Sequence, residues 1–145
     1  MRHPGLEFGA RVRDVTYVDR PGAYAIILAS DNLLAFVPGK AGRLYLPGGG
    51  IEHGEPPESA LLREIAEEIG WRAHILGIVG YATQFLFAAG EGYFAIRATY
   101  FRTGLIERCA GQPAHEIVWL TAAAAVPSLA RKSDAWAISQ IWHSN

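Results

Sequence analysis

The segment from Pro57 to Ile69 constrains the fold more than any other part of the chain. Its apolar residues recur every three or four positions, which is the spacing of one face of an α-helix. The proline in the first turn and Gly70 after the last apolar residue are typical of the two ends of a helix. Three consecutive glycines, 48–50, precede the helix and predict irregular backbone that another group can approach closely.

The flanking sequence is typical of strands, because apolar and polar residues alternate between turn signals. A turn at 30–32 predicts a hairpin between the expected strands 23–29 and 33–37, and a turn at 90–92 joins 73–87 to 93–101. The tail predicts a terminal helix, capped by Ser133 and packed on a sheet. The expected strands are 11–17, 23–29, 33–37, 44–46, 73–87, 93–101 and 117–120. Since no repeat or long linker divides the chain, residues 1–145 are expected to form one mixed α/β domain.

Composition narrows the classes of partner. The 13 Lys and Arg residues nearly balance the 14 Asp and Glu residues, so no broad cationic surface is expected. This disfavours nucleic acids and anionic membranes as partners. The longest uncharged stretch, 75–90, is shorter than the roughly twenty apolar residues that span a bilayer. With one cysteine and no apolar leader at 1–9, a reducing, cytoplasmic location is expected.

Three carboxylates of the predicted helix lie on one side of it. Glu64, Glu67 and Glu68 fall opposite the apolar face, where they repel one another, and two of them lie in the last turn, where the helix dipole disfavours negative charge. A solvated acidic face is one interpretation. The other is a bound dication, and hard oxygen ligands favour Mg²⁺ or Mn²⁺ over zinc. Two more carboxylates, Glu52 and Glu55, lie in the preceding loop.

The stretch 49–71, GGIEHGEPPESALLREIAEEIGW, resembles the Nudix box, G-x5-E-x7-R-E-U-x-E-E-x-G-U with U a bulky apolar residue. Every constrained position matches. The matching residues are Gly49, Glu55, Arg63, Glu64, Ile65, Glu67, Glu68, Gly70 and Trp71. Resemblance to the Nudix hydrolase (MutT-like) family implies an α+β fold, in which a mixed β-sheet lies between helices and the box forms a loop-helix-loop. It also implies Mg²⁺- or Mn²⁺-dependent cleavage of a pyrophosphate bond in a nucleoside diphosphate linked to another group, such as a triphosphate, nucleotide sugar or dinucleotide.

The resemblance also implies roles for individual residues. Glu67 and Glu68 resemble the principal metal ligands, with the Gly49 carbonyl as an extra ligand. Glu64 resembles a further ligand or the catalytic base. Arg63 is expected to serve catalysis by pairing with Glu55, which fixes the ligand geometry. Gly50 and Gly70 are expected to support the two ends of the loop-helix-loop.

Two residues outside the box complete the candidate site. Glu116 is a second candidate for the base, because it precedes a predicted strand in a loop that could bring it to the metals. Arg97 is the candidate for substrate binding, since strand alternation places it opposite the apolar face of Phe94, Ile96 and Ala98.

The main alternative is a Nudix-fold module that binds or senses a nucleotide without cleaving it. The glycines match neither a P-loop nor a dinucleotide-binding fingerprint, and the histidines form no H-E-x-x-H zinc motif. The partner that the family resemblance implies is a small nucleoside diphosphate derivative. A homodimer is compatible with the exposed edge of a small mixed sheet, but no residue requires one.

Overall fold

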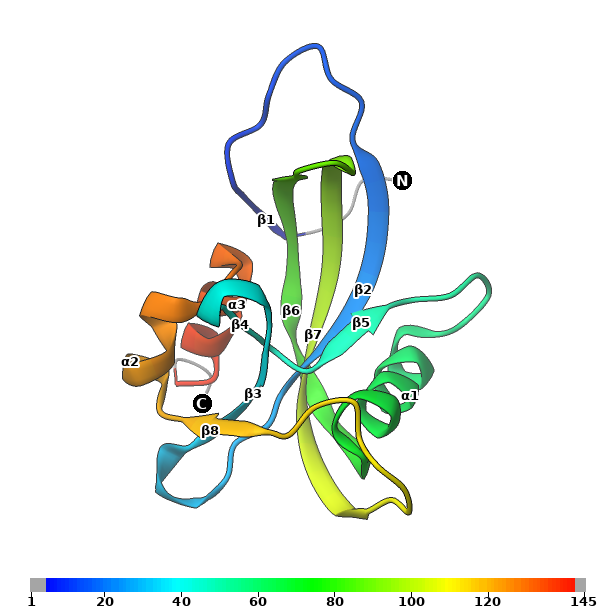
Figure 1. Cartoon of the computed structure of the whole chain (residues 1–145), viewed down its shortest axis with the longest axis vertical. Coiled ribbons are helices and arrows are strands. Elements are labelled where there is room, and N and C mark those ends of the chain that lie inside the picture. Colours follow the sequence, from blue (N-terminus) through cyan, green and yellow to red (C-terminus); the bar gives the residue numbers. More distant parts are fainter. Residues whose placement is uncertain (1–4, 143–145) are drawn as a thin grey trace.

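The structure, a computed structural model, describes residues 5–142 and contains two sheets and three α-helices within that range (Figure 1). The larger, mixed sheet has the strand order β1-β6-β7-β2-β5, and the smaller has the order β4-β3-β8. The strands of the larger sheet are β1 (Leu6–Phe8), β2 (Val18–Ile26), β5 (Gly48–Gly50), β6 (Trp71–Ala88) and β7 (Gly92–Arg108). Those of the smaller sheet are β3 (Leu34–Pro38), β4 (Leu44–Tyr45) and β8 (Val118–Leu120). The helices are α1 (Pro57–Ile69), α2 (Ala122–Ala125) and α3 (Lys132–Gln140).

The larger sheet carries a separate apolar cluster on each face, as strand alternation requires. One cluster joins the β7 residues Phe94, Ile96 and Tyr100 to Ile138 of α3. The other joins Ala23 and Ala25 of β2, with Phe101 of β7, to the apolar face of α1. In Figure 1, α1 accordingly lies on one side of the sheet and α2 and α3 on the other. The expected mixed sheet between helices is confirmed.

Helix α1 has the bounds predicted for it, and Gly70 ends it in the left-handed conformation with φ of 72°. Its buried face is centred on Leu61, Ile65 and Ile69, whereas Leu62 and Ala66 are only partly buried. Helix α1 contacts β5 and β2 as well as β6. Its orientation therefore turns the side that carries Glu68 toward the sheet. Glu67 is exposed, whereas Glu64 and Glu68 are only partly exposed, so the interpretation of a solvated acidic face does not fit these two residues.

The three glycines form strand β5, and the prediction of irregular backbone there was wrong. β5 pairs antiparallel with β2, with Tyr24 opposite Gly48 and Gly22 opposite Gly50. A Cβ added to Gly48 would lie 2.2 Å from the Ala23 carbonyl oxygen, and its φ of 138° is one that L side chains rarely adopt. Glycine is therefore what lets this edge strand form against β2.

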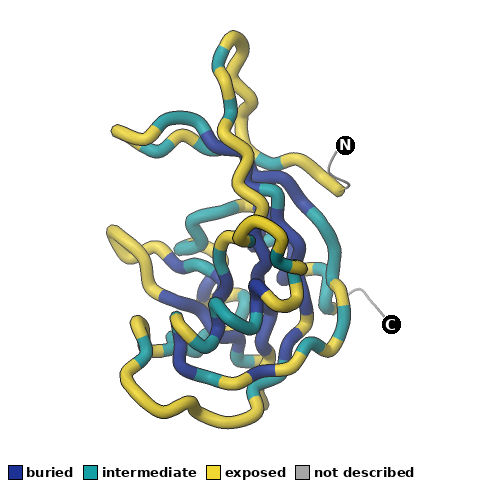
Figure 2. The backbone as a smooth tube through the Cα atoms, turned by 90° about the vertical axis from the view of Figure 1, so that its right-hand side faces the viewer, coloured by how far each residue is buried: buried dark blue, intermediate teal, exposed yellow. Residues whose placement is uncertain are grey.

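Other local predictions met with mixed results. The expected strand 11–17 is instead an exposed connection in which Asp14 has a positive φ of 61°, and most of it is yellow in Figure 2. The turn at 30–32 is present, and the Ala29 N–H donates to the Leu33 carbonyl across it, but β2 and β3 then enter different sheets. The terminal helix packs on β6 as expected. Ser133 is not its cap, since the helix begins one residue earlier and the Ser133 hydroxyl lies within hydrogen-bond distance, 2.8 Å, of the Tyr100 hydroxyl.

None of the helices within residues 5–142 is long and apolar enough to cross a membrane.

Candidate active site

The last turns of α1 lie against the glycine strand. The Gly48 N–H donates to Glu68 Oε1 over 3.0 Å, which fixes one oxygen of this carboxylate. A Cβ added to Gly49 would lie 2.6 Å from the carboxyl carbon of Glu64. The absence of side chains in β5 therefore allows two acidic residues of α1 to lie directly beside the strand backbone.

Arg63 connects the loop before α1 to these acidic residues. Its Nε and Nη2 donate to the two carboxylate oxygens of Glu55, each over 2.9 Å, and Nη2 also donates to the Gly50 carbonyl over 3.2 Å. Its Nη1 donates to Glu64 over 3.0 Å and to Glu67 over 3.5 Å. The structure thus brings together Arg63 and the loop carboxylate that the family resemblance pairs with it.

The pairing with Arg63 keeps Glu55 ionised. Two hydrogen bonds from the guanidinium, and one from the backbone N–H of Glu52, lower the pKa of the Glu55 carboxyl to about 2. A carboxylate with this pKa carries a full negative charge throughout the neutral range. Glu55 is thus suited to hold the loop against α1 rather than to exchange protons.

Glu68 has the opposite electrostatic environment. Burial against β5, reinforced by the negative charge of Glu64, raises the pKa of the Glu68 carboxyl to about 7. The hydrogen bond from Gly48 and the positive charge of Arg131 oppose this shift without cancelling it. Burial and a like charge make the ionised form of this carboxyl unfavourable. A cation placed beside it would stabilise the ionised form.

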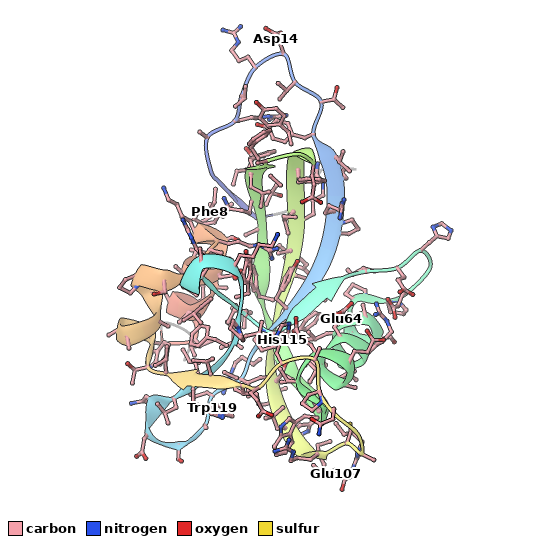
Figure 3. All side chains as sticks on the ribbon, in the orientation of Figure 1. Phe8, Asp14, Glu64, Glu107, His115 and Trp119 are labelled. Carbon is pink, nitrogen blue, oxygen red and sulfur yellow. The ribbon has the colours of Figure 1, made fainter. Side chains whose placement is uncertain are left out.

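Glu64, Glu67 and Glu68 of α1 line one side of a cavity of about 210 Å³. The other side is formed by Ala114 and His115, whose backbone N–H groups donate to the Glu67 and Glu68 carbonyls over 3.4 and 2.8 Å. Figure 3 shows Glu64 of α1 and His115 of the loop before β8 close together at the centre of the molecule. Three carboxylates and no lysine or arginine line this cavity, so its donor set fits a hard dication.

That set of ligands is not preassembled. Among residues 5–142, no group of three acidic, histidine or cysteine side chains is close enough to hold a metal ion as it stands. The reason is visible in the contacts of Arg63, which draws one oxygen each of Glu64 and Glu67 toward its own Nη1. A dication at this site has to draw those two side chains away from the guanidinium.

The two candidates outside the box lie away from this cavity. Glu116 is exposed in the loop before β8, beside His115 but not among the residues that line the acidic cavity. Arg97 pairs with Asp19 over 3.0 Å and lines a different cavity of about 360 Å³, under the connection between β1 and β2. The side chain of the neighbouring residue, Ile96, points to the opposite face of the sheet and lines the cavity that contains Gly48–Gly50 and Glu68. The structure therefore does not bring Arg97 together with Glu68.

A groove beside Glu68 was not predicted from the sequence. One cavity of about 270 Å³ is lined by Gly48–Gly50, Glu68, Arg20 and Arg131. A second, of about 290 Å³, shares both arginines and continues to Phe94. No local sequence pattern predicts that these two arginines share a groove, because they lie more than a hundred residues apart in the chain.

Taken together, the fold and the site define a class of α+β domains in which a loop-helix-loop presents carboxylates beside a mixed sheet. The family model for the NUDIX domain matches residues 18–140, and the chain belongs to this family. The family recognised from the box is thereby confirmed.

Known relatives agree with this assignment. A segment of 57 residues is 47% identical to "Nudix hydrolase 25" of Arabidopsis thaliana, and the match spans 35% of this chain and 30% of that protein. A NUDIX hydrolase from Nitrosomonas europaea has a similar fold, with a TM-score of 0.73, 18% identity, and coverage of 87% of this chain and 90% of the other. The E. coli dihydroneopterin triphosphate pyrophosphohydrolase gives a TM-score of 0.63 at 21% identity, covering 87% of this chain and 97% of the other.

Proposed function

We propose that this chain is a pyrophosphohydrolase that cleaves a nucleoside diphosphate linked to another group and requires Mg²⁺ or Mn²⁺. The observation that carries the proposal is that Glu68 lines two neighbouring cavities of different chemistry. On one side three carboxylates line a cavity that fits dications. On the other, Glu68 also lines a groove that contains two arginines. A phosphorylated ligand with a dication is the chemistry that such an arrangement binds.

Glu64, Glu67 and Glu68 are the residues that would hold the metal, with the Gly49 carbonyl beside them. When bound, the dication would neutralise the phosphate oxygens and make a water molecule more acidic. Glu68 would bind it as the carboxylate, losing the proton that its burial favours. Arg63 stays attached to Glu55 and Gly50 when Glu64 and Glu67 turn away from it, and so keeps α1 in register with its loop.

A carboxylate close to the attacked phosphate then takes the proton from water. Glu64 is the first candidate, because its carboxylate lies against the backbone of β5 and lines the acidic cavity. Glu116 is the second, since it adjoins His115 in an exposed loop. Arg97, paired with Asp19 in a different cavity, is not part of this scheme.

The groove indicates how the rest of the substrate lies. Beyond the two arginines its wall becomes apolar, with Leu86 and Phe94. A diphosphate near Glu68 and the arginines would leave the group it carries, a base or a second moiety, against this wall. Because one structural neighbour is called UDP-X diphosphatase and another a dihydroneopterin triphosphate pyrophosphohydrolase, the ligands to be tested should include nucleotide sugars and triphosphates.

The proposal is tested with nucleoside triphosphates, nucleotide sugars and dinucleotides in the presence of Mg²⁺ or Mn²⁺. Products are resolved by phosphorus NMR in ¹⁸O-labelled water, which identifies the attacked phosphorus. Turnover is expected to be lost in Glu68→Gln and retained in the control Glu58→Gln, which alters an exposed residue in the first turn of the same helix. Turnover unchanged in Glu68→Gln would refute the proposed site, and metal-dependent binding without hydrolysis would favour the non-catalytic module instead.

A further inference from the structure

Arg131 is a cation that contacts two tyrosine rings and interacts electrostatically with the buried Asp134. Its guanidinium carbon lies 5.2 Å from the ring centre of Tyr24 and 5.2 Å from that of Tyr45. Within residues 5–142 no carboxylate lies within ion-pair distance of it, and its buried Nε has no hydrogen-bond partner there. A buried, unpaired N–H of a charged group is costly unless a ligand supplies an acceptor.

The backbone around Arg131 is fixed from two directions. The preceding residue, Ala130, donates its N–H to the Leu44 carbonyl over 3.0 Å, which ties this segment to β4. The Arg131 carbonyl accepts the N–H of Asp134 over 3.2 Å, in the first turn of α3. Its side chain is therefore positioned before any ligand arrives, which lowers the entropy cost of binding.

Arg131 stands where the two parts of the groove meet. It lines both the cavity that contains Glu68 and the cavity that contains Phe94, and Arg20 does the same. The Arg20 guanidinium lies 4.5 Å from the Phe94 ring centre, and it too has no ion pair in the part of the chain that the structure describes. Two such cations between an acidic end and an apolar end favour an anionic group of the ligand at this point.

We infer that Arg131 is a specificity-determining residue that binds the second phosphate of the substrate, the one next to the phosphate held at the carboxylates of α1. This rests on the proposed function, because it takes those carboxylates as the place of attack. Arg131 selects ligands with two adjacent phosphates over monophosphates, and it acts through binding rather than through the chemical step. A planar guanidinium between two tyrosine rings does this in a way that an ammonium group cannot reproduce.

The test measures the binding of methylenediphosphonate, whose P–C–P bridge cannot be hydrolysed, by calorimetry in the presence of Mg²⁺. Loss of a charged hydrogen bond, about 1.5 to 3 kcal/mol, predicts a dissociation constant roughly 10 to 150 times larger in Arg131→Gln. Arg131→Lys keeps the charge but not the stacking and is expected to bind with intermediate strength. Arg102→Gln, which changes an exposed arginine of β7, is the matched control and should bind as the parent protein does.

The outcomes separate this inference from the proposed function. If the parent protein and Arg131→Gln bind methylenediphosphonate equally, or the parent protein does not bind it, the inference is overturned. If the parent protein binds it and Arg131→Gln does not, while no nucleotide is hydrolysed, the inference stands and the hydrolase assignment fails. Thermal unfolding identifies any variant that does not fold. If only Arg131→Lys is folded, an unchanged dissociation constant in that variant overturns the inference.

Where a substrate is found, Arg131→Lys gives a second readout. A binding role predicts a raised KM with kcat little changed, because the contact is made before and during the reaction alike. A fall in kcat at constant KM would contradict it.

Discussion

Replacing Glu68 with glutamine is expected to make the metal-free protein more stable while removing its activity. The Glu68 carboxyl is held against β5, and its pKa is raised from the ordinary value of 4.5 to about 7. Glutamine has a similar shape and can keep the hydrogen bond from the Gly48 N–H. The substitution therefore removes a charge that the fold disfavours and leaves the contact in place.

The sign and size follow from linkage between protonation and folding. Because the pKa is higher in the folded state, the native protein binds the proton more tightly, and this contribution to stability is lost as the pH rises from 4.5 through 7. A shift of this size corresponds to about 3 kcal/mol, and partial exposure of the side chain reduces the expected effect to roughly 1 to 2 kcal/mol. At pH 8 this raises the melting temperature of Glu68→Gln by roughly 3 to 8 °C over the parent protein.

The assay is thermal unfolding of both proteins between pH 4.5 and 8, first with a chelator and then with Mg²⁺. The difference should vanish near pH 4.5, where both side chains are uncharged, and grow toward pH 8. Magnesium should stabilise the parent protein and have little effect on Glu68→Gln, since a bound dication stabilises the carboxylate form. A Glu68→Gln protein that is equally stable or less stable at pH 8 in chelator would refute this account of the site.

Two further substitutions examine the backbone of the site and its support. Gly49→Ala would place a Cβ 2.6 Å from the carboxyl carbon of Glu64; turnover is expected to fall at least about tenfold, whereas the control Gly77→Ala, with open space around it, should retain activity. Tyr100→Phe removes the hydroxyl that donates to buried Asp134 over 2.7 Å, and a loss of roughly 1 to 3 kcal/mol in urea unfolding is expected. The Leu46 N–H also donates to Asp134, over 3.5 Å, and a loss below about 0.5 kcal/mol would contradict the contribution assigned to the Tyr100 hydroxyl.

The sequence predicts those parts of the fold whose determinants are local. Helix α1 follows from its own periodicity, with a proline at its start and Gly70 in the left-handed conformation at its end. The segment 11–17 also alternates, but it forms no strand, because alternation indicates pairing only where a partner strand is available. The glycines of β5 are the converse case. Their sequence predicts irregular backbone, but β2 offers a partner and they form a strand.

The same distinction applies to the candidate site. The fixed spacing of the box brings Arg63 and Glu55 together, because a loop and the helix after it carry both; the contact of Arg63 with Glu64 was not foreseen. The burial of Glu68 depends on how α1 lies against β5, which periodicity alone does not determine. Arg131 is further from prediction, since its partners Tyr24 and Tyr45 lie more than eighty residues earlier in the chain. Only the tertiary structure brings them to one groove.

Because β5 consists of three glycines, it presents only amide and carbonyl groups to the groove. A wall built of main chain cannot be altered by exchanging side chains, and a Cβ at its first or second position would collide with β2 or α1. Attempts to change the ligand preference of this protein should therefore leave that edge alone and vary the facing side chains, such as Arg20 and Tyr45, although a change at Tyr45 also removes a ring contact of Arg131.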